Sequence, residues 1–165
     1  MARSLRTAKV TALVATLLLV ATACSKSSNT PTNPAYDVFA QKFRYHGMPT
    51  TIPSGNMQIN FSNKESFPIV HEMIVAALPA GKTAADIIDS AKVPGCEGGG
   101  PCESQYLHFG EVDDVSTGAT ISEVFNLPPG NYFFACWQQG TVSNPDSTTG
   151  PPHASKGMVF TFTVS

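Results

Sequence analysis

Four side chains in this sequence could together bind one soft metal ion. They are His71, Cys136, His153 and Met158. A thiolate, two imidazoles and a thioether are the donors of a trigonal copper site that has a long axial bond to methionine. Thiolate and thioether sulfur favour Cu(I), and imidazole accepts both oxidation states. The set therefore predicts a site for one copper ion that alternates between two oxidation states.

Each of these residues also has a structural explanation, and the sequence leaves both explanations open. Cys136 could be a buried, inert thiol, because cysteine is among the most buried residue types. Alternatively, a metal holds it as a thiolate. His153 could lie in a surface loop, Met158 could be a core residue that opens the last strand, and His71 could be a hydrogen-bonded strand histidine. The presence of all four donors together favours the metal site.

The segment Gly130–Cys136 reads Gly-Asn-Tyr-Phe-Phe-Ala-Cys and is similar to the G-x-Y-x-F/Y-x-C strand of the cupredoxins, a family that includes plastocyanin, azurin and rusticyanin. His153 and Met158 match the H-x₄-M pattern of that family. His71 matches its first histidine, which follows a strand that ends near an asparagine, here Asn63. The resemblance covers nearly the whole domain and is most specific at the C-terminal end. It extends to a bacterial subgroup of exported cupredoxin-like proteins.

The resemblance implies a type 1 copper protein that carries single electrons in the cell envelope, and not an enzyme. Cys136 would supply the thiolate and the electron path, and His71 and His153 the equatorial imidazoles. Met158 would supply the axial thioether. A redox partner protein is also implied, and we expect the chain to be a monomer. Two alternatives stay open: a metal-free binding module with this fold, and a periplasmic copper carrier that uses the pair His71 and Met73.

The spacing between Cys136 and His153 departs from the family pattern. Sixteen residues separate them, whereas family members have shorter loops. A long loop must be ordered by its own packing, although the entropy of loop closure rises only slowly with length. Pro145, Pro151 and Pro152 are expected to stiffen this segment.

Residues 1–23 have the features of a bacterial export signal. Three basic residues precede an apolar run that ends in Ala-Thr-Ala, and this run is too short to span a membrane. Cleavage before Cys24 fits an ordinary signal peptide and also resembles a lipoprotein signal, in which Cys24 becomes lipidated. Residues 24–34 are rich in Ser, Asn, Thr and Pro and predict a flexible tether. We expect an exported protein at the periplasmic or extracellular face, attached to the membrane only through this lipid.

The composition excludes several classes of protein. Removal of the signal leaves seven basic and twelve acidic residues, a net charge of −5. Without a cluster of Lys and Arg, a nucleic-acid partner is not expected. Charged residues make up only 13% of the chain, which argues against a disordered tail or a coiled coil. No catalytic nucleophile is recognisable, and four histidines are too few for a second copper centre.

Residues 35–165 read as one all-β domain with many short strands. Alternation of apolar and polar residues predicts half-buried strands, and a continuous apolar run predicts a central strand. The predicted strands are 38–45, 57–63, 70–78, 131–137 and 157–164. Thr83, followed three residues later by Asp86, predicts the start of one short helix. Short strands joined by Gly and Pro turns predict a β-sandwich or a barrel, and the resemblance narrows this to a Greek-key β-sandwich.

Cys96 and Cys102 bracket the spacer Glu-Gly-Gly-Gly-Pro. An exported protein can form disulfides, and such a spacer can bring two Cα atoms within the ~4.4–6.8 Å that a disulfide needs. We expect a Cys96–Cys102 bridge. Two free thiols, or a bridge to Cys136, are the alternatives.

Three further polar residues carry explicit expectations. Glu72 directly follows His71, and strand neighbours face opposite sides, so Glu72 is expected to lie in solvent. His46 and His108 have no partner in a ligand motif and are expected to be surface or structural residues. The pair His71-Glu72 lacks the second histidine and the helix of a zinc H-E-x-x-H site.

Overall fold

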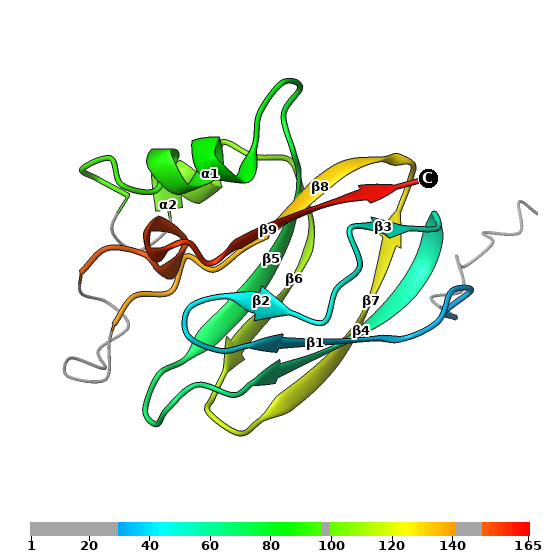
Figure 1. Cartoon of the computed structure of the whole chain (residues 1–165), viewed down its shortest axis with the longest axis horizontal. Helices are drawn as coiled ribbons and strands as arrows, with labels where there is room; N and C mark the ends of the chain where they lie inside the picture. The colour runs from blue at the N-terminus through cyan, green and yellow to red at the C-terminus, as the bar shows by residue number, and fades with distance from the viewer. Residues whose placement is uncertain (1–29, 97–99, 141–149) are drawn as a thin grey trace, which may run out of the picture.

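The computed structural model describes residues 30–96, 100–140 and 150–165 of the chain, which form two stacked sheets (Figure 1). The four-stranded sheet has the order β2 (Tyr45–His46), β1 (Tyr36–Ala40), β4 (Gly55–Asn63) and β7 (Thr120–Leu127). The five-stranded sheet has the order β3 (Thr51–Ile52), β9 (Val159–Val164), β8 (Gly130–Ala135), β5 (His71–Ala77) and β6 (His108–Val115). Neighbouring strands are antiparallel except for the parallel pairs β1–β4 and β3–β9. The predicted all-β Greek-key sandwich is confirmed.

Within the described residues, three short helical segments accompany the sheets. They are α1 (Ala84–Ser90), the single turn α2 (Gly100–Glu103) and the 3₁₀ helix η1 (His153–Lys156). Among the residues that the structure describes, no helix has the length and apolar character needed to cross a membrane.

Alternating side chains fill the space between the sheets. In β4, Met57, Ile59 and Phe61 are fully buried and the residues between them are partly exposed. They belong to one apolar cluster that also contains Phe134 of β8 and Phe162 of β9. Burial of each such side chain stabilises the fold by about 1.5–3 kcal/mol. The period-2 pattern of β4 therefore predicted its buried face correctly.

The outer face of the five-stranded sheet is also covered. Ile74 of β5 and Phe133 of β8 point away from the main core and pack against Ile87 of α1 in a second apolar cluster. Both strands are consequently buried on two sides, which explains why β5 reads as a continuous apolar run after His71 and Glu72.

Helix α1 begins as the sequence predicted. Thr83 is its N-cap: the Thr83 hydroxyl accepts a hydrogen bond from the Asp86 N–H at 3.4 Å, and the Asp86 carboxylate accepts one from the Thr83 N–H at 2.9 Å. This reciprocal pair is a capping box, and it satisfies two N–H groups that the helix start would otherwise leave unpaired.

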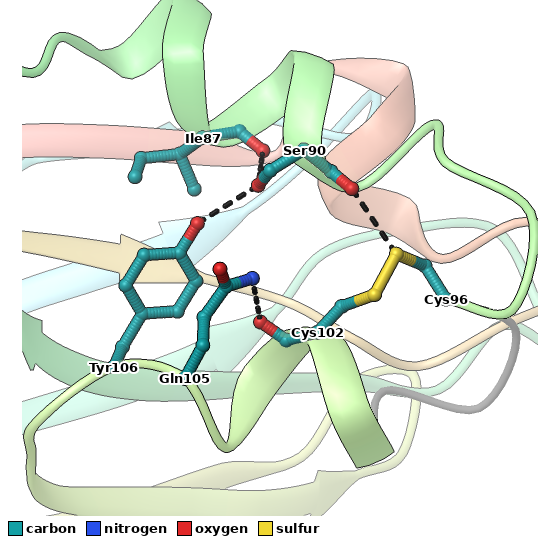
Figure 2. The surroundings of a disulfide bond; sticks show 6 residues. All are labelled: Ile87, Ser90, Cys96, Cys102, Gln105 and Tyr106. Carbon is teal, nitrogen blue, oxygen red and sulfur yellow. Dashed lines mark hydrogen bonds between the residues drawn. A yellow bond between two sulfur atoms is a disulfide. The ribbon is translucent and has the colours of Figure 1, made fainter.

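The Cys96–Cys102 disulfide is present and joins the segment after α1 to α2 (Figure 2). Its two Cα atoms are 5.3 Å apart. The Tyr106 and Ser90 hydroxyls, 2.8 Å apart, tie the residues after α2 to α1. We call α1, α2 and this disulfide the outer cover. Residues 97–99 of its loop lie outside the described part of the chain.

The predicted first strand, 38–45, is wrong in one respect, because it is interrupted by a tight turn. Gln41 and Arg44 exchange two backbone hydrogen bonds of 3.0 and 3.1 Å, and Lys42 and Phe43 between them both have φ of 53°. Two successive left-handed residues are what a type I′ hairpin turn requires, and this turn normally contains Gly or Asn. Without those residues the sequence carried no turn signal. The strand therefore becomes the hairpin β1–β2.

Candidate metal centre

Alternation along β5 and β8 places His71 and Cys136 on the inner face of the five-stranded sheet. Strands β5 and β8 pair with Ile74 opposite Ala135, so Cys136 lies one step beyond this pair and His71 is its diagonal neighbour. Diagonal neighbours on one sheet face are within reach of long side chains. The side chains of both residues are fully buried.

His153 reaches the same point from η1, and backbone hydrogen bonds hold η1 against the end of β8. The His153 N–H donates to the Gln138 carbonyl at 2.8 Å, and the Ala154 N–H donates to the Cys136 carbonyl at 2.7 Å. These bonds fix both ends of the long Cys136–His153 connection. Residues 141–149, including Pro145, lie outside the described part of the chain.

Three ligand atoms converge at this point. Cys136 Sγ lies 3.4 Å from His153 Nδ1 and 3.7 Å from His71 Nδ1, and the two Nδ1 atoms are 3.1 Å apart. A transition-metal ion typically bonds to imidazole nitrogen at ~2.0–2.1 Å and to thiolate sulfur at ~2.3 Å. Two such bonds span more than any of the three separations. One ion could therefore reach all three atoms.

Burial keeps both imidazoles neutral near pH 7. Burial, followed by the neighbouring His153 ring, lowers the pKa of His71 to about 3. Burial also lowers the pKa of His153 to about 4, against hydrogen bonding to Gly140 that opposes the shift. A neutral imidazole is the form that binds a metal. Both rings are thus in the binding form throughout the neutral range.

Cys136 is a free, fully buried thiol. Burial raises its pKa well above the ordinary value, so without a metal the neutral thiol is favoured. The Glu72 N–H points at Sγ from 3.5 Å, and such a donor stabilises a thiolate once a metal removes the proton. The predicted alternative of a bridge between Cys136 and another cysteine is wrong, because Cys96 and Cys102 pair with each other.

Met158, the fourth predicted ligand, is bonded through its backbone to two of the converging residues. It is fully buried and belongs to the same apolar cluster as Cys136. Its N–H donates to the His153 carbonyl at 3.1 Å, and its carbonyl accepts from the Cys136 N–H at 3.3 Å. The backbone of Met158 is therefore tied directly to two of the three converging residues.

The prediction that Glu72 lies in solvent is wrong. Glu72 is only 7% exposed, and its carboxylate accepts hydrogen bonds from the Trp137 N–H at 2.5 Å and the Gln138 amide at 3.3 Å. Its side chain does leave the strand on the side opposite His71. That side is nevertheless covered, because Trp137 and Gln138, which follow β8, lie over it. Burial raises the pKa of Glu72 to about 7.

Phe43 covers the centre from the β1–β2 turn, and sequence reasoning did not identify it. Its half-buried ring makes edge contacts with His153 and His71, at centroid distances of 4.8 and 5.6 Å. The Lys156 ammonium lies 4.7 Å from the centre of the Phe43 ring. Arg44 donates to the carbonyls of Phe43 and Lys156 at 2.8 and 2.7 Å. The turn is thereby fastened to η1.

The other two histidines do not enter the centre. His46 is exposed and stacks on Phe39, which agrees with its predicted surface role. His108 lies with Glu103 and Glu111 in a partly exposed group. Its Nδ1 is 3.7 Å from the Glu103 carboxylate. His108 begins β6 and Glu111 lies within it, at the edge of the five-stranded sheet and away from the centre.

Solved structures with the same fold include three auracyanins. Auracyanin from the photosynthetic bacterium Roseiflexus castenholzii, in its dithionite-reduced form, is 16% identical, with 82% of this chain and 99% of that chain covered and a TM-score of 0.52. Auracyanin B is 18% identical, with coverage of 82% and 91% and a TM-score of 0.54. Auracyanin A from Chloroflexus aurantiacus, described as a "blue" copper protein, is 17% identical, with coverage of 80% and 99% and a TM-score of 0.53. No protein-family model and no curated protein matches the sequence.

Proposed function

Starting from the cupredoxin fold that this chain shares with the auracyanins, we propose that it binds one type 1 copper ion and carries single electrons. The observation that carries the proposal is the convergence of Cys136 Sγ with the Nδ1 atoms of His71 and His153 within 3.7 Å of one another. This donor set suits copper in both oxidation states, because it joins a soft thiolate to two imidazoles. Met158 is the proposed axial ligand.

The protein's own contribution is to hold these donors in place. When bound, copper would supply a one-electron redox couple. The strands β5 and β8 fix His71 and Cys136, and the hydrogen bonds at the base of η1 fix His153. Burial keeps both imidazoles neutral and excludes water from the donors. A rigid, dry site requires little rearrangement when the charge changes, which favours electron transfer over catalysis.

A visible spectrum tests this proposal. Protein reconstituted with one equivalent of Cu(II) should show an intense absorption band from the copper–thiolate bond. The band should be lost in Cys136→Ala and in His153→Ala, whereas His46→Ala, a change at an exposed histidine, should leave it intact. Tight Cu(I) binding without any band would instead support a copper carrier. Failure to bind either ion would support a metal-free binding module.

The carrier alternative has less support from the geometry. A carrier must exchange its ion with other proteins, and this favours exposed ligands. Met73, the partner of His71 in that alternative, is fully buried in the main core, as is His71 itself. The buried thiolate donor also belongs to a resident site and not to an exchangeable one.

We propose that the partner protein docks over Phe43 and has an acidic surface. Phe43 is the half-buried residue that contacts both imidazoles, and Lys42, Arg44 and Lys156 lie around it. Three cations at this position contrast with the acidic net charge of the whole chain. Complementary charge accelerates the encounter of redox partners at low salt.

Small redox reagents test the docking proposal. At low ionic strength, Lys42→Glu should slow oxidation of the reduced copper protein by ferricyanide several-fold, because the new carboxylate repels this anion. Lys92→Glu removes another exposed lysine, which lies near the outer cover, and should change this rate little. Equal effects of the two substitutions would contradict docking at Phe43.

The location of the protein is also a proposal. We infer export through the signal of residues 1–23 and attachment through a lipid on Cys24, both of which lie outside the described residues. Metabolic labelling with a radioactive fatty acid, lost in Cys24→Ala, tests the anchor. An unlabelled but exported protein would favour the ordinary signal peptide.

A further inference from the structure

The second nitrogen of His71 faces a carboxylate. His71 Nδ1 is directed to the metal centre, and Nε2 lies 3.8 Å from Oε2 of Glu65. The His71 side chain is fully buried and that of Glu65 is only 11% exposed. Neither of these two atoms has a hydrogen-bond partner in the structure. Buried polar atoms are almost always paired, so this facing pair calls for an explanation.

The two imidazoles differ in the group that faces their Nε2 atoms. His153 Nε2 lies 3.0 Å from the Gly140 carbonyl oxygen, which can only accept a hydrogen bond. The proton of neutral His153 is therefore on Nε2, and its Nδ1 is bare. A hydrogen bond across the 3.1 Å contact between the two Nδ1 atoms therefore has His71 Nδ1 as its donor. Neutral His71 consequently has no proton on Nε2, and two acceptors face each other across the 3.8 Å gap.

Glu65 is held in this place by Asn63. The fully buried Asn63 side chain accepts from the Glu65 N–H at 2.9 Å and donates to the carbonyls of Ile69 and Val115 at 2.9 and 2.8 Å. The loop between β4 and β5 is thus fixed on both sides of Glu65. Its carboxylate does not approach His71 by chance.

We propose that Glu65 is a positioning residue for His71 and accepts a hydrogen bond from Nε2–H when Nδ1 binds the metal. This inference rests on the proposed function. A metal on Nδ1 requires that nitrogen to be bare, so the single proton of the neutral ring moves to Nε2, and the ring gains or loses none. Nε2–H then faces the Glu65 carboxylate, and the gap closes to a hydrogen bond. This hydrogen bond fixes the ring and makes Nδ1 a stronger ligand for the metal.

A carboxylate at this position also affects the redox couple. Its negative charge lies one imidazole away from the centre, and it stabilises the more positive oxidation state. His153, which has only a neutral carbonyl at the equivalent position, does not contribute such a charge. The pair Glu65–His71 therefore lowers the reduction potential relative to a site with two carbonyl partners.

Zinc(II), which has no redox chemistry, is the first probe. In ¹⁵N-labelled protein, long-range ¹H–¹⁵N spectra should show His71 protonated at Nδ1 without metal and at Nε2 with zinc. Glu65→Ala should weaken zinc binding about 10–100-fold. Glu65→Gln, whose amide oxygen can still accept the hydrogen bond, should restore most of the affinity. Glu123→Ala, a change at an exposed carboxylate on β7, is the matched control.

The potential of the copper-loaded protein is the second probe. Glu65→Gln should raise it, because the charge is lost while the hydrogen bond stays, and Glu123→Gln should leave it unchanged. An affinity of Glu65→Ala equal to that of Glu123→Ala, or a His71 proton that stays on Nδ1 with zinc bound, would overturn the role of Glu65 and leave the proposed function standing. Wild-type protein that binds neither zinc nor copper would overturn both.

Discussion

The three cysteines in the described part of the chain lie in two regions that are held together by different means. In the outer cover, Cys96 and Cys102 are six residues apart and joined covalently. At the metal centre, Cys136 is a free thiol next to histidines that are 65 and 17 positions away in the sequence. Both regions use β5 and β8, but on opposite faces of the sheet.

The difference shows what each kind of link can do. A covalent bridge stabilises a short loop whatever surrounds it, mainly by restricting the unfolded chain. A ligand thiol must stay unbridged, so the segments around it depend on hydrogen bonds from buried polar groups such as Asn63. We therefore expect changes at the centre to affect stability and metal binding together, and changes in the outer cover to affect stability alone.

The largest expected effect comes from Asn63→Ala. This change removes the buried hydrogen bonds to the Glu65 N–H and to the Ile69 and Val115 carbonyls, of which the Ile69 carbonyl keeps only the Thr117 hydroxyl at 3.0 Å. We expect the free energy of unfolding to fall by about 3 kcal/mol. Asn60→Ala, in the same strand with hydrogen bonds at the surface, should cost less than about 1 kcal/mol. Urea unfolding of both variants measures the difference. Equal losses would contradict the importance of buried hydrogen bonds for the segments around the centre.

Removal of the disulfide should have the next largest effect. Cys96→Ser combined with Cys102→Ser should lower the free energy of unfolding by about 2 kcal/mol, as expected for so short a loop. The copper absorption band should keep its position and intensity, because the outer cover lies on the other face of the sheet. A shifted band would show that the two regions are coupled through β5 and β8.

The pH dependence of metal affinity sharpens the description of the centre. His71 and His153 have lowered pKa values of about 3 and 4, so both are already deprotonated above pH 5. The pKa of Cys136 is raised well above its ordinary value, so its thiol proton must leave when a metal binds. Zinc affinity should therefore rise about tenfold per pH unit, one proton per ion.

Calorimetry in buffers of different ionisation enthalpy counts these protons. Glu72, whose pKa is raised to about 7 by burial, could release a fraction of a second proton when a cation binds nearby. Glu72→Gln removes this group and should bring the count to one. Two or more protons released by that variant at pH 5.5 would mean that the imidazoles are not held neutral.

The smallest expected effect lies in the outer cover. Thr83→Ala removes one half of the capping box of α1 and should lower the free energy of unfolding by about 1 kcal/mol. Thermal unfolding measures this loss, and the copper band serves as the internal control. A changed band would contradict the independence of the outer cover.

Regular alternation made the strands and the inner faces predictable from the sequence. The pattern of β4 predicted the buried face that the structure shows, and the G-x-Y-x-F/Y-x-C match of β8 identified Cys136 as a candidate ligand. Periodicity reports which side of a strand a residue takes, and this is enough to bring His71 and Cys136 together once the strands pair.

The surroundings of the centre could not be predicted in the same way. Alternation predicted on which side of β5 the Glu72 side chain lies. It could not predict that another segment covers that side. Glu65 lies in a loop without periodicity, and its position depends on the buried Asn63 side chain. Phe43 occupies a left-handed turn without Gly or Asn, so no local signal identified it. These features depend on tertiary contacts.

The attachment of the N-terminal segment has a consequence for orientation. Thr32 and Asn33 donate hydrogen bonds to the Asn56 carbonyl, near the first residues of β4. The centre lies at the other end of this strand, beyond Asn63, and nine residues of strand span roughly 27 Å. Any segment that precedes Thr32 is therefore joined to the molecule at the end remote from the ligands. In a molecule anchored through Cys24, the face around Phe43 would then point away from the membrane.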